Sequence, residues 1–198
     1  MPPDSPHIVL ICGPNGAGKS TLAPRLLTGA LRVTEFVNAD VVARGLSAFQ
    51  PEEVSLAAGR IMLGRLRELA RQRASFAFET TLASRSFAPW LTRLKASRYA
   101  FHLLFLWLPD DDLAVSRVAD RVRHGGHSVP EEVVRRRYRA GLSNLFRLYQ
   151  PLASTWRVYD NSRATGPRLV AIGWTPSNRR ILDRRAWERI REGAKRET

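Results

Sequence analysis

The sequence predicts an α/β fold, a three-layer sandwich in which helices cover both faces of a mostly parallel sheet. Three observations support this prediction. Short apolar runs alternate with helical stretches along most of the chain, which is typical of parallel sheets with crossover helices. The chain has 198 residues, enough for one domain with a sizeable core. Hydrophobic residues make up 44% and charged residues 25%, so a chain that is disordered throughout is excluded.

Five short segments are the expected parallel strands, and they cover residues 7–12, 34–38, 74–78, 99–108 and 156–159. The expected helices cover 22–27, 51–73, 87–97, 110–123 and 130–149. A last strand over 168–174 and a terminal helix over 182–194 complete the prediction. The longest run, 99–108, is about half the length of a membrane span, so we expect a central strand there and no membrane segment.

The segment after the first expected strand matches the phosphate-binding pattern G-x-x-x-x-G-K-[ST]. It reads Gly13-Pro-Asn-Gly-Ala-Gly-Lys-Ser20 and stands between a buried strand and a helix, which is the context that confirms such a match. The candidate nucleotide-binding residues are Gly13, Asn15, Gly16, Ala17, Gly18, Lys19, Ser20 and Thr21. Lys19 can reach the β- and γ-phosphates, and the Ser20 hydroxyl can ligate Mg²⁺. The pattern therefore predicts a nucleoside triphosphate, Mg²⁺ and a P-loop NTPase fold.

Two acidic residues follow expected strands at the edge of the sheet where open α/β folds bind ligands. Asp40 comes after the second strand and Glu79 after the third. In phosphoryl transfer, one such carboxylate can accept the proton of an attacking hydroxyl, and a second can organise Mg²⁺ or hold the acceptor. The Thr81 hydroxyl could bind phosphate or acceptor oxygens. The structural alternatives are a helix cap for Asp40 and an exposed strand end for Glu79.

Residues 117–139 hold seven arginines, which predicts a helical lid over a triphosphate. Arg117 and Arg121 are four residues apart and share one helix face. The glycines at 125 and 126 permit a hinge, and guanidinium groups would stabilise charge on the transferred phosphoryl group. His127 is either a phosphate contact or an exposed loop residue. For most of these arginines the alternative is a solvated helix face.

The chain is strongly basic, with a formal net charge of +14, and this favours an anionic partner without naming it. Residues 163–198 hold ten basic residues against four acidic ones. We therefore expect a P-loop domain over 1–162, including the lid at about 117–139, and a basic appendage over 163–198 that packs on the same domain or trails from it. The only cysteine, Cys12, excludes an internal disulfide, and no signal-like segment is visible, so a reducing, cytoplasmic location is expected.

Together these residues resemble the zeta-toxin family of P-loop kinases. The matching pieces are 13–21, 36–40, 76–81, 125–130 and, more weakly, 158–162. The resemblance implies a kinase-like fold and transfer of phosphate from ATP, with Mg²⁺, to a hydroxyl of a small anionic metabolite such as a nucleotide sugar. It also implies a toxin with a separately encoded antitoxin protein as its partner. The candidate catalytic residues are Asp40 as base, Lys19, Arg117 and Arg121. Those for the acceptor are Asp40, Glu79, Thr81 and His127, and those for Mg²⁺ are Ser20 and Glu79.

Two other functions stay open at this point. The basic charge would suit a polynucleotide or RNA-terminal kinase, although aromatic and basic residues do not interleave as in a recognisable nucleic-acid module. A non-catalytic protein that binds ATP and a partner would keep the phosphate loop for binding alone.

Overall fold

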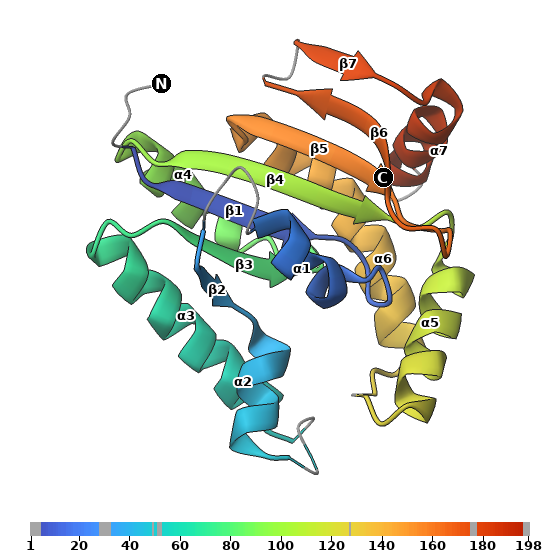
Figure 1. The fold of residues 1–198 in the computed structure, drawn as a ribbon, viewed down its shortest axis with the longest axis horizontal. Helices are drawn as coiled ribbons and strands as arrows, with labels where there is room; N and C mark the ends of the chain where they lie inside the picture. The colour runs from blue at the N-terminus through green and yellow to red at the C-terminus, as the bar shows by residue number, and fades with distance from the viewer. Residues whose placement is uncertain are drawn as a thin grey trace.

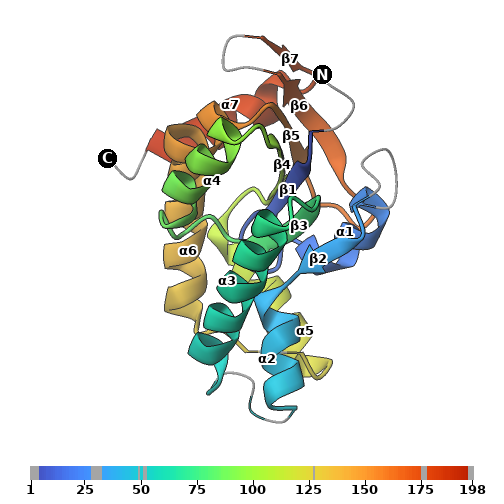
Figure 2. The ribbon, with the colours of Figure 1, turned by 90° about the vertical axis from the view of Figure 1, so that its left-hand side faces the viewer.

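The computed structural model describes residues 5–27, 33–48, 50, 53–126, 128–174 and 178–195, which form a seven-stranded sheet with helices on both faces (Figures 1 and 2). The strands are β1 (His7–Cys12), β2 (Glu35–Val37), β3 (Phe76–Thr80), β4 (Ala100–Trp107), β5 (Thr155–Asp160), β6 (Arg168–Gly173) and β7 (Arg179–Ile181). The helices are α1 (Lys19–Leu27), α2 (Ala39–Leu46), α3 (Ser55–Arg71), α4 (Phe87–Ala96), α5 (Asp111–Arg123), α6 (Glu131–Asn144) and α7 (Arg184–Lys195). Two short helical turns, η1 (Leu145–Tyr149) and η2 (Gln150–Leu152), follow α6.

The sheet has the strand order β2-β3-β1-β4-β5-β6-β7. The first five of these strands pair in parallel, and β6 and β7 add antiparallel pairs at one edge. Parallel strands have their carboxyl ends at one edge of the sheet, so the segments that follow β1, β2 and β3 meet there. The predicted α/β class with a mostly parallel sheet is confirmed.

Helices pack on both faces of the sheet, as the prediction of three layers requires. α3, α4, α6 and α7 cover one face, and α1 packs on the other (Figure 2). β4 lies in the middle, and all eight of its residues are buried, which explains a run that is apolar except for His102. None of the described helices has the length and apolar character that a membrane crossing requires.

The helix after β2 is capped by Asn38, so the alternative role of Asp40 as its N-cap is not the one observed. Asn38 Oδ1 accepts hydrogen bonds from Asp40 N at 2.8 Å and from Val41 N at 3.3 Å. Asparagine is among the best N-cap residues because its side-chain oxygen satisfies free N–H groups of the first turn. Asp40 lies within that first turn, and its carboxylate is left to other contacts.

Three elements, α2, η2 and β7, lie outside the sequence prediction, whereas η1 falls within the helix predicted over 130–149. β7 is a three-residue edge strand of exposed Arg-Arg-Ile, which shows no alternation of apolar and polar residues. η1 is a π-helical turn that continues α6, and helical periodicity does not distinguish it from an α-helix. The predicted helix over 51–73 is observed from Ser55, and residues 51–52 lie outside the described part of the chain.

The described C-terminal residues extend the same sheet and core. β6 pairs with β5, and Trp187 of α7 stacks on Trp156 of β5 with 5.6 Å between ring centroids. Arg168 joins β5 to the start of α7, since its Nη2 lies 3.3 Å from Asp160 Oδ2 and 2.8 Å from Asp183 Oδ2. Between residues 168 and 195, the segment expected as a basic appendage therefore packs on the P-loop domain.

Candidate active site

The phosphate loop connects β1 to α1 through a sharp turn. Gly13 has φ +144°, and a Cβ added there would lie 2.2 Å from the carbonyl oxygen of Leu106. Gly18 has φ +79°, in the left-handed region that favours glycine. This backbone turns N–H groups of the loop and the N-terminus of α1 toward one point, which makes a site for an anion.

The turn after β5 holds the phosphate loop from the side. Asn161 Nδ2 donates to Ala17 O at 2.8 Å. Arg117 of α5 clamps the same turn, since its Nη1 donates to Asn161 O at 2.7 Å and its Nη2 to Ser162 O at 2.8 Å. Arg117 therefore ties α5 to the turn that supports the loop, in addition to any contact with a ligand.

Lys19 is the first residue of α1 and is only 8% exposed. Its Nζ donates a hydrogen bond to Pro14 O at 3.0 Å. Burial lowers the pKa of Lys19, and the carboxylates of Glu79 and Asp40 act in the opposite direction. A cation with so little solvent around it gains more from a bound phosphate than an exposed lysine does. Lys19 is thus well suited to bind a phosphate at the loop.

Ser20, Asn38 and Glu79 meet at the sheet edge from three different segments. Ser20 Oγ donates to Glu79 Oε2 at 2.9 Å, and Asn38 Nδ2 donates to Ser20 Oγ at 3.3 Å. Burial raises the pKa of Glu79, while Lys19 and the hydrogen bond from Ser20 lower it.

The oxygens of Ser20 and Glu79 fit Mg²⁺, which takes hard oxygen ligands. Mg²⁺ is usually bound by one or two protein groups and completes its shell with water and substrate phosphates. Within the described residues, no group of three His, Cys, Asp or Glu side chains could hold a metal ion. A Mg²⁺ ion held by Ser20 and Glu79 would complete its shell with water and phosphate oxygens.

Two cavities open at this edge of the sheet and share four residues. The loop cavity, of about 440 Å³, is lined by the phosphate loop, α1 and α5. The α6 cavity, of about 520 Å³, is lined by α2, α3, α4, α6 and the segment after β3. The residues common to both are Asn15, Lys19, Asp40 and Glu79. A group bound in one cavity can therefore meet a group bound in the other at these four side chains.

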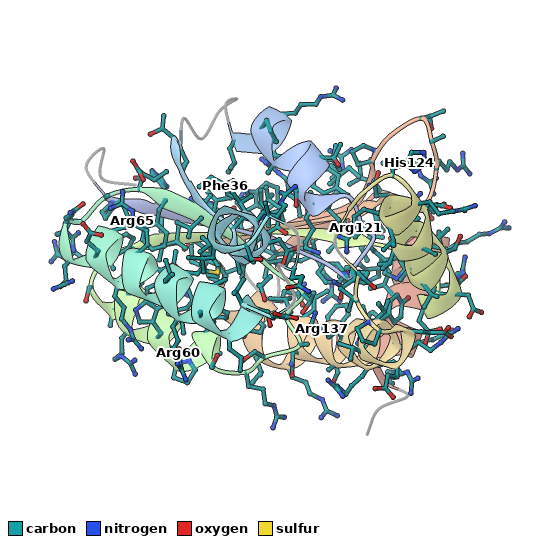
Figure 3. The ribbon with its side chains drawn as sticks, turned by 90° about the horizontal axis from the view of Figure 1, so that it is seen from below. Phe36, Arg60, Arg65, Arg121, His124 and Arg137 are labelled. Carbon is teal, nitrogen blue, oxygen red and sulfur yellow. The ribbon has the colours of Figure 1, made fainter. Side chains whose placement is uncertain are left out.

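Arginines from α5 and α6 line the two cavities. Arg121 of α5 lies in the loop cavity, whereas Arg136 and Arg137 of α6 lie in the α6 cavity. In the view from below, Arg121 and Arg137 lie in the middle part of the picture (Figure 3). Burial lowers the pKa of Arg137, and the carboxylate of Asp40 acts in the opposite direction. Arg137 and Asp40 are therefore close enough to interact across the α6 cavity.

The predicted lid segment is formed by α5, a short connection and α6. Ion pairs join the two helices, since Arg135 Nη1 lies 2.7 Å from Asp112 Oδ1 and 3.2 Å from Asp111 Oδ1. Tyr138 OH donates to Leu108 O at 2.8 Å and ties α6 to the end of β4. The arginines of this segment thus divide between structural ion pairs and the walls of the two cavities. His127 lies outside the described residues.

The segment after β3 forms one wall of the α6 cavity and is held in place by α6. A Cβ added at Gly141 would lie 2.2 Å from the Thr81 carbonyl oxygen. Asn144 Nδ2 donates to Leu82 O at 2.8 Å and to Ala83 O at 3.2 Å. Leu82 is fully buried with φ +61°, so the chain turns here in an unusual conformation. α6 therefore supplies arginines to the cavity and also fixes the wall that carries Thr81.

Residues 8–145 of the chain match the protein family described as AAA domain. The chain belongs to this AAA domain family. An uncharacterized protein of Haemophilus influenzae is 28% identical over 130 residues, which cover 66% of this chain and 91% of that protein.

Two solved structures share the fold of this AAA domain at less than 25% sequence identity. AvrRxo1-ORF1:AvrRxo1-ORF2 with sulphate ions gives a TM-score of 0.74 at 18% identity, over 94% of this chain and 63% of that one. The PezAT chromosomal toxin–antitoxin system of Streptococcus pneumoniae gives a TM-score of 0.62 at 15% identity, over 83% and 70% of the two chains. The chain thus spans less than two thirds of the AvrRxo1 structure it matches. The shared fold is that of kinase-like P-loop NTPases.

Most of the residues predicted for the site of this AAA domain lie around the two cavities. Those that line them are Asn15, Gly16, Gly18, Lys19, Ser20, Thr21, Asp40, Glu79, Thr81, Arg117 and Arg121. Gly13 and Ala17 line neither cavity but shape the phosphate loop, and Ala17 is fully buried.

Among the polar residues that line the cavities, Asn38, Arg136 and Arg137 are not among the site residues predicted from the sequence, although both arginines lie in the predicted lid segment. The run of arginines at 135–137 signals that α6 carries a cationic face. The rotation of α6 about its axis decides which of the arginines at 135–137 face the cavity. The contacts of Gly141 and Tyr138 fix this rotation. Asn38 could have been found as a cap signal directly before the helix.

Proposed function

We propose that this AAA domain transfers the γ-phosphate of ATP to a hydroxyl group of a small anionic metabolite, such as a nucleotide sugar, in the manner of zeta toxins. The observation that carries the proposal is the meeting of two cavities at Lys19, Asp40 and Glu79. A kinase needs two binding spaces that share a reaction point, whereas a protein that only binds ATP needs one.

The loop cavity is the site for ATP in this proposal. The N–H groups of the loop, the N-terminus of α1 and Lys19 hold the phosphates. Ser20 and Glu79 would hold Mg²⁺, which neutralises phosphate charge when bound. Arg121 adds a further positive charge from α5. The solved complex of AvrRxo1-ORF1 and -ORF2 with ATP, which has a TM-score of 0.71 to this chain, supports ATP as the ligand.

The α6 cavity is the site for the acceptor. The hydroxyl group of the acceptor gives its proton to the Asp40 carboxylate while the hydroxyl oxygen forms a bond to the γ-phosphorus of ATP. The bond between that phosphorus and the β–γ bridging oxygen breaks, and ADP leaves. Arg136 and Arg137 face an anionic group of the acceptor, and Thr81 lies in the wall where it can bind an acceptor oxygen.

We also propose that the protein acts as the toxin of a toxin–antitoxin pair, with a separately encoded antitoxin as its partner. The likeness of the fold to PezAT, a toxin–antitoxin system, supports this role. The role predicts that expression of the chain slows growth and that the Asp40→Asn variant does not.

Incubation with γ-labelled ATP and a metabolite extract, followed by mass spectrometry of the labelled product, tests the transfer. Wild type is expected to label a hydroxyl-bearing anionic metabolite. Asp40→Asn should reduce the rate by about 10²–10⁴-fold because the general base is lost, and Lys19→Ala should remove transfer through the loss of phosphate binding. Full transfer by Asp40→Asn would show that the base is misassigned. No labelled metabolite from wild type would refute the kinase itself.

A further inference from the structure

One face of the sheet carries no described helix over β5, β6 and β7. Figure 1 looks onto this face: α1 lies lower, over the middle of the sheet, and α7 lies behind β6. In β5, exposed or half-buried side chains alternate with buried ones, as expected for a strand with one covered face. The buried set faces α7, where Trp156 stacks on Trp187. The other set faces outward.

The strand register aligns two arginines on this outward face. Arg157 of β5 pairs with Ile172 of β6, and Ile172 pairs with Arg180 of β7. Directly paired residues point to the same face, so the three side chains form one row, and the two arginines are about 10 Å apart at their Cα atoms. Both arginines are exposed, and neither guanidinium makes an ion pair or hydrogen bond within the described residues.

A tryptophan lies beside this row. Trp174 N donates to Asn178 O at 3.0 Å, which extends the β6–β7 ladder one pair beyond Gly173 and Arg179. Trp174 directly follows the end of β6 at Gly173, and continuing the two-residue alternation of that strand puts it on the side of Ile172. Its side chain is 49% exposed, which is unusual for so large an apolar group. We define Arg157, Ile172, Trp174 and Arg180 as the open sheet face.

Other basic residues of the same region are used inside the fold. Arg168 bridges Asp160 and Asp183, and the guanidinium of Arg189 lies 5.4 Å from the ring centroid of Trp107. These contacts account for part of the positive charge of the C-terminal segment. Arg157 and Arg180 have no comparable internal use, so their charge is available to a partner.

We propose that the open sheet face binds single-stranded nucleic acid. Guanidinium groups pair with phosphates through two parallel hydrogen bonds, and an exposed tryptophan offers a surface on which a base stacks. An exposed sheet that combines arginine with an aromatic ring suits an unpaired strand, whose bases are free to stack. An acidic peptide would use the charges but would leave Trp174 without a partner of this kind. This binding does not depend on the phosphoryl transfer proposed above.

The experiment measures binding of the full chain to a fluorescein-labelled uridine oligomer of about 12 nucleotides, by anisotropy at several salt concentrations. Each phosphate contact on a single strand contributes about 0.7 to the slope of log K against log salt. The double variant Arg157→Ala/Arg180→Ala should lower that slope by about 1.4 and the affinity at 0.1 M salt by roughly 25-fold. Trp174→Ala should weaken binding about tenfold with no change of slope, and Trp174→Phe should restore most of the loss.

The matched control is Arg67→Ala/Arg93→Ala, which removes the same charge from exposed arginines of α3 and α4 on the other side of the sheet. It should leave the slope unchanged. The proposal is overturned if wild type does not bind the oligomer, if the control pair weakens binding as much as the Arg157/Arg180 pair, or if polyglutamate of equal charge competes equally well. ATP-dependent transfer should be the same in both double variants, so this proposal and the kinase proposal fail separately.

Discussion

Replacing Gly141 by alanine tests whether the contact between α6 and the segment after β3 sets the shape of the α6 cavity. The added Cβ would lie 2.2 Å from the Thr81 carbonyl oxygen, more than 1 Å inside a normal contact of about 3.5 Å. Alanine stabilises a helix interior over glycine by roughly 1 kcal/mol. Forcing a methyl group into filled space costs about 1–3 kcal/mol, and the upper part of this range, about 2–3 kcal/mol, applies here because a backbone atom cannot swing away as a side chain does. We expect a net loss of about 1–2 kcal/mol.

The matched control is Gly64→Ala in α3, where nothing lies within 4 Å of an added Cβ. The same substitution should there stabilise the protein by roughly 1 kcal/mol. Thermal unfolding should therefore give a Tm about 2–8 °C below wild type for Gly141→Ala and about 2–4 °C above it for Gly64→Ala. Labelled product in the metabolite assay should fall for Gly141→Ala alone. A Tm at or above that of wild type for Gly141→Ala, with full product, would refute the reasoning.

Three further predictions concern two buried polar residues, His102 and Asn144, and the half-buried Glu79. Burial lowers the pKa of His102 from 6.5 to about 4. The free energy of unfolding should therefore fall by about 3 kcal/mol as the pH drops from 6.5 to 4. Chemical denaturation at a series of pH values measures this fall, and His102→Gln should abolish it. Burial raises the pKa of Glu79, so the ionised carboxylate destabilises the folded state once the pH rises above the unfolded pKa of 4.5. Glu79→Gln should therefore raise Tm at pH 7, and at no pH above 4.5 should it lower Tm below that of wild type. The same variant should lose phosphoryl transfer. Asn144→Ala leaves the Leu82 and Ala83 carbonyls without their donor and should cost about 1–3 kcal/mol in urea unfolding; an unchanged midpoint would show that water replaces the amide.

The sequence by itself determined the phosphate loop and the central sheet. The loop is local in sequence: its glycines, Lys19 and Ser20 lie within eight consecutive residues between a strand and a helix, although distant residues such as Asn161 also support it in the fold. The parallel strands could be predicted because burial on both faces demands runs of apolar residues, as in β4. The positions of Asp40 and Glu79 at this edge followed from the same logic, since parallel strands end there, although Glu79 lies within β3, which continues to Thr80, and not after it.

Only the tertiary structure decided which side chains meet between the two cavities and which charges stay at the surface. Asn38 caps α2, which leaves Asp40 at the shared edge. The rotation of α6 directs Arg137 to the α6 cavity and Arg135 to the ion pairs with α5. The basic C-terminal segment is part of the sheet because β6 pairs with β5 and β7 pairs with β6. The sequence pattern does not reveal β7, because an exposed edge strand needs no alternation of apolar and polar residues. These outcomes depend on contacts between residues far apart in the chain, and a single sequence does not encode them in any local pattern.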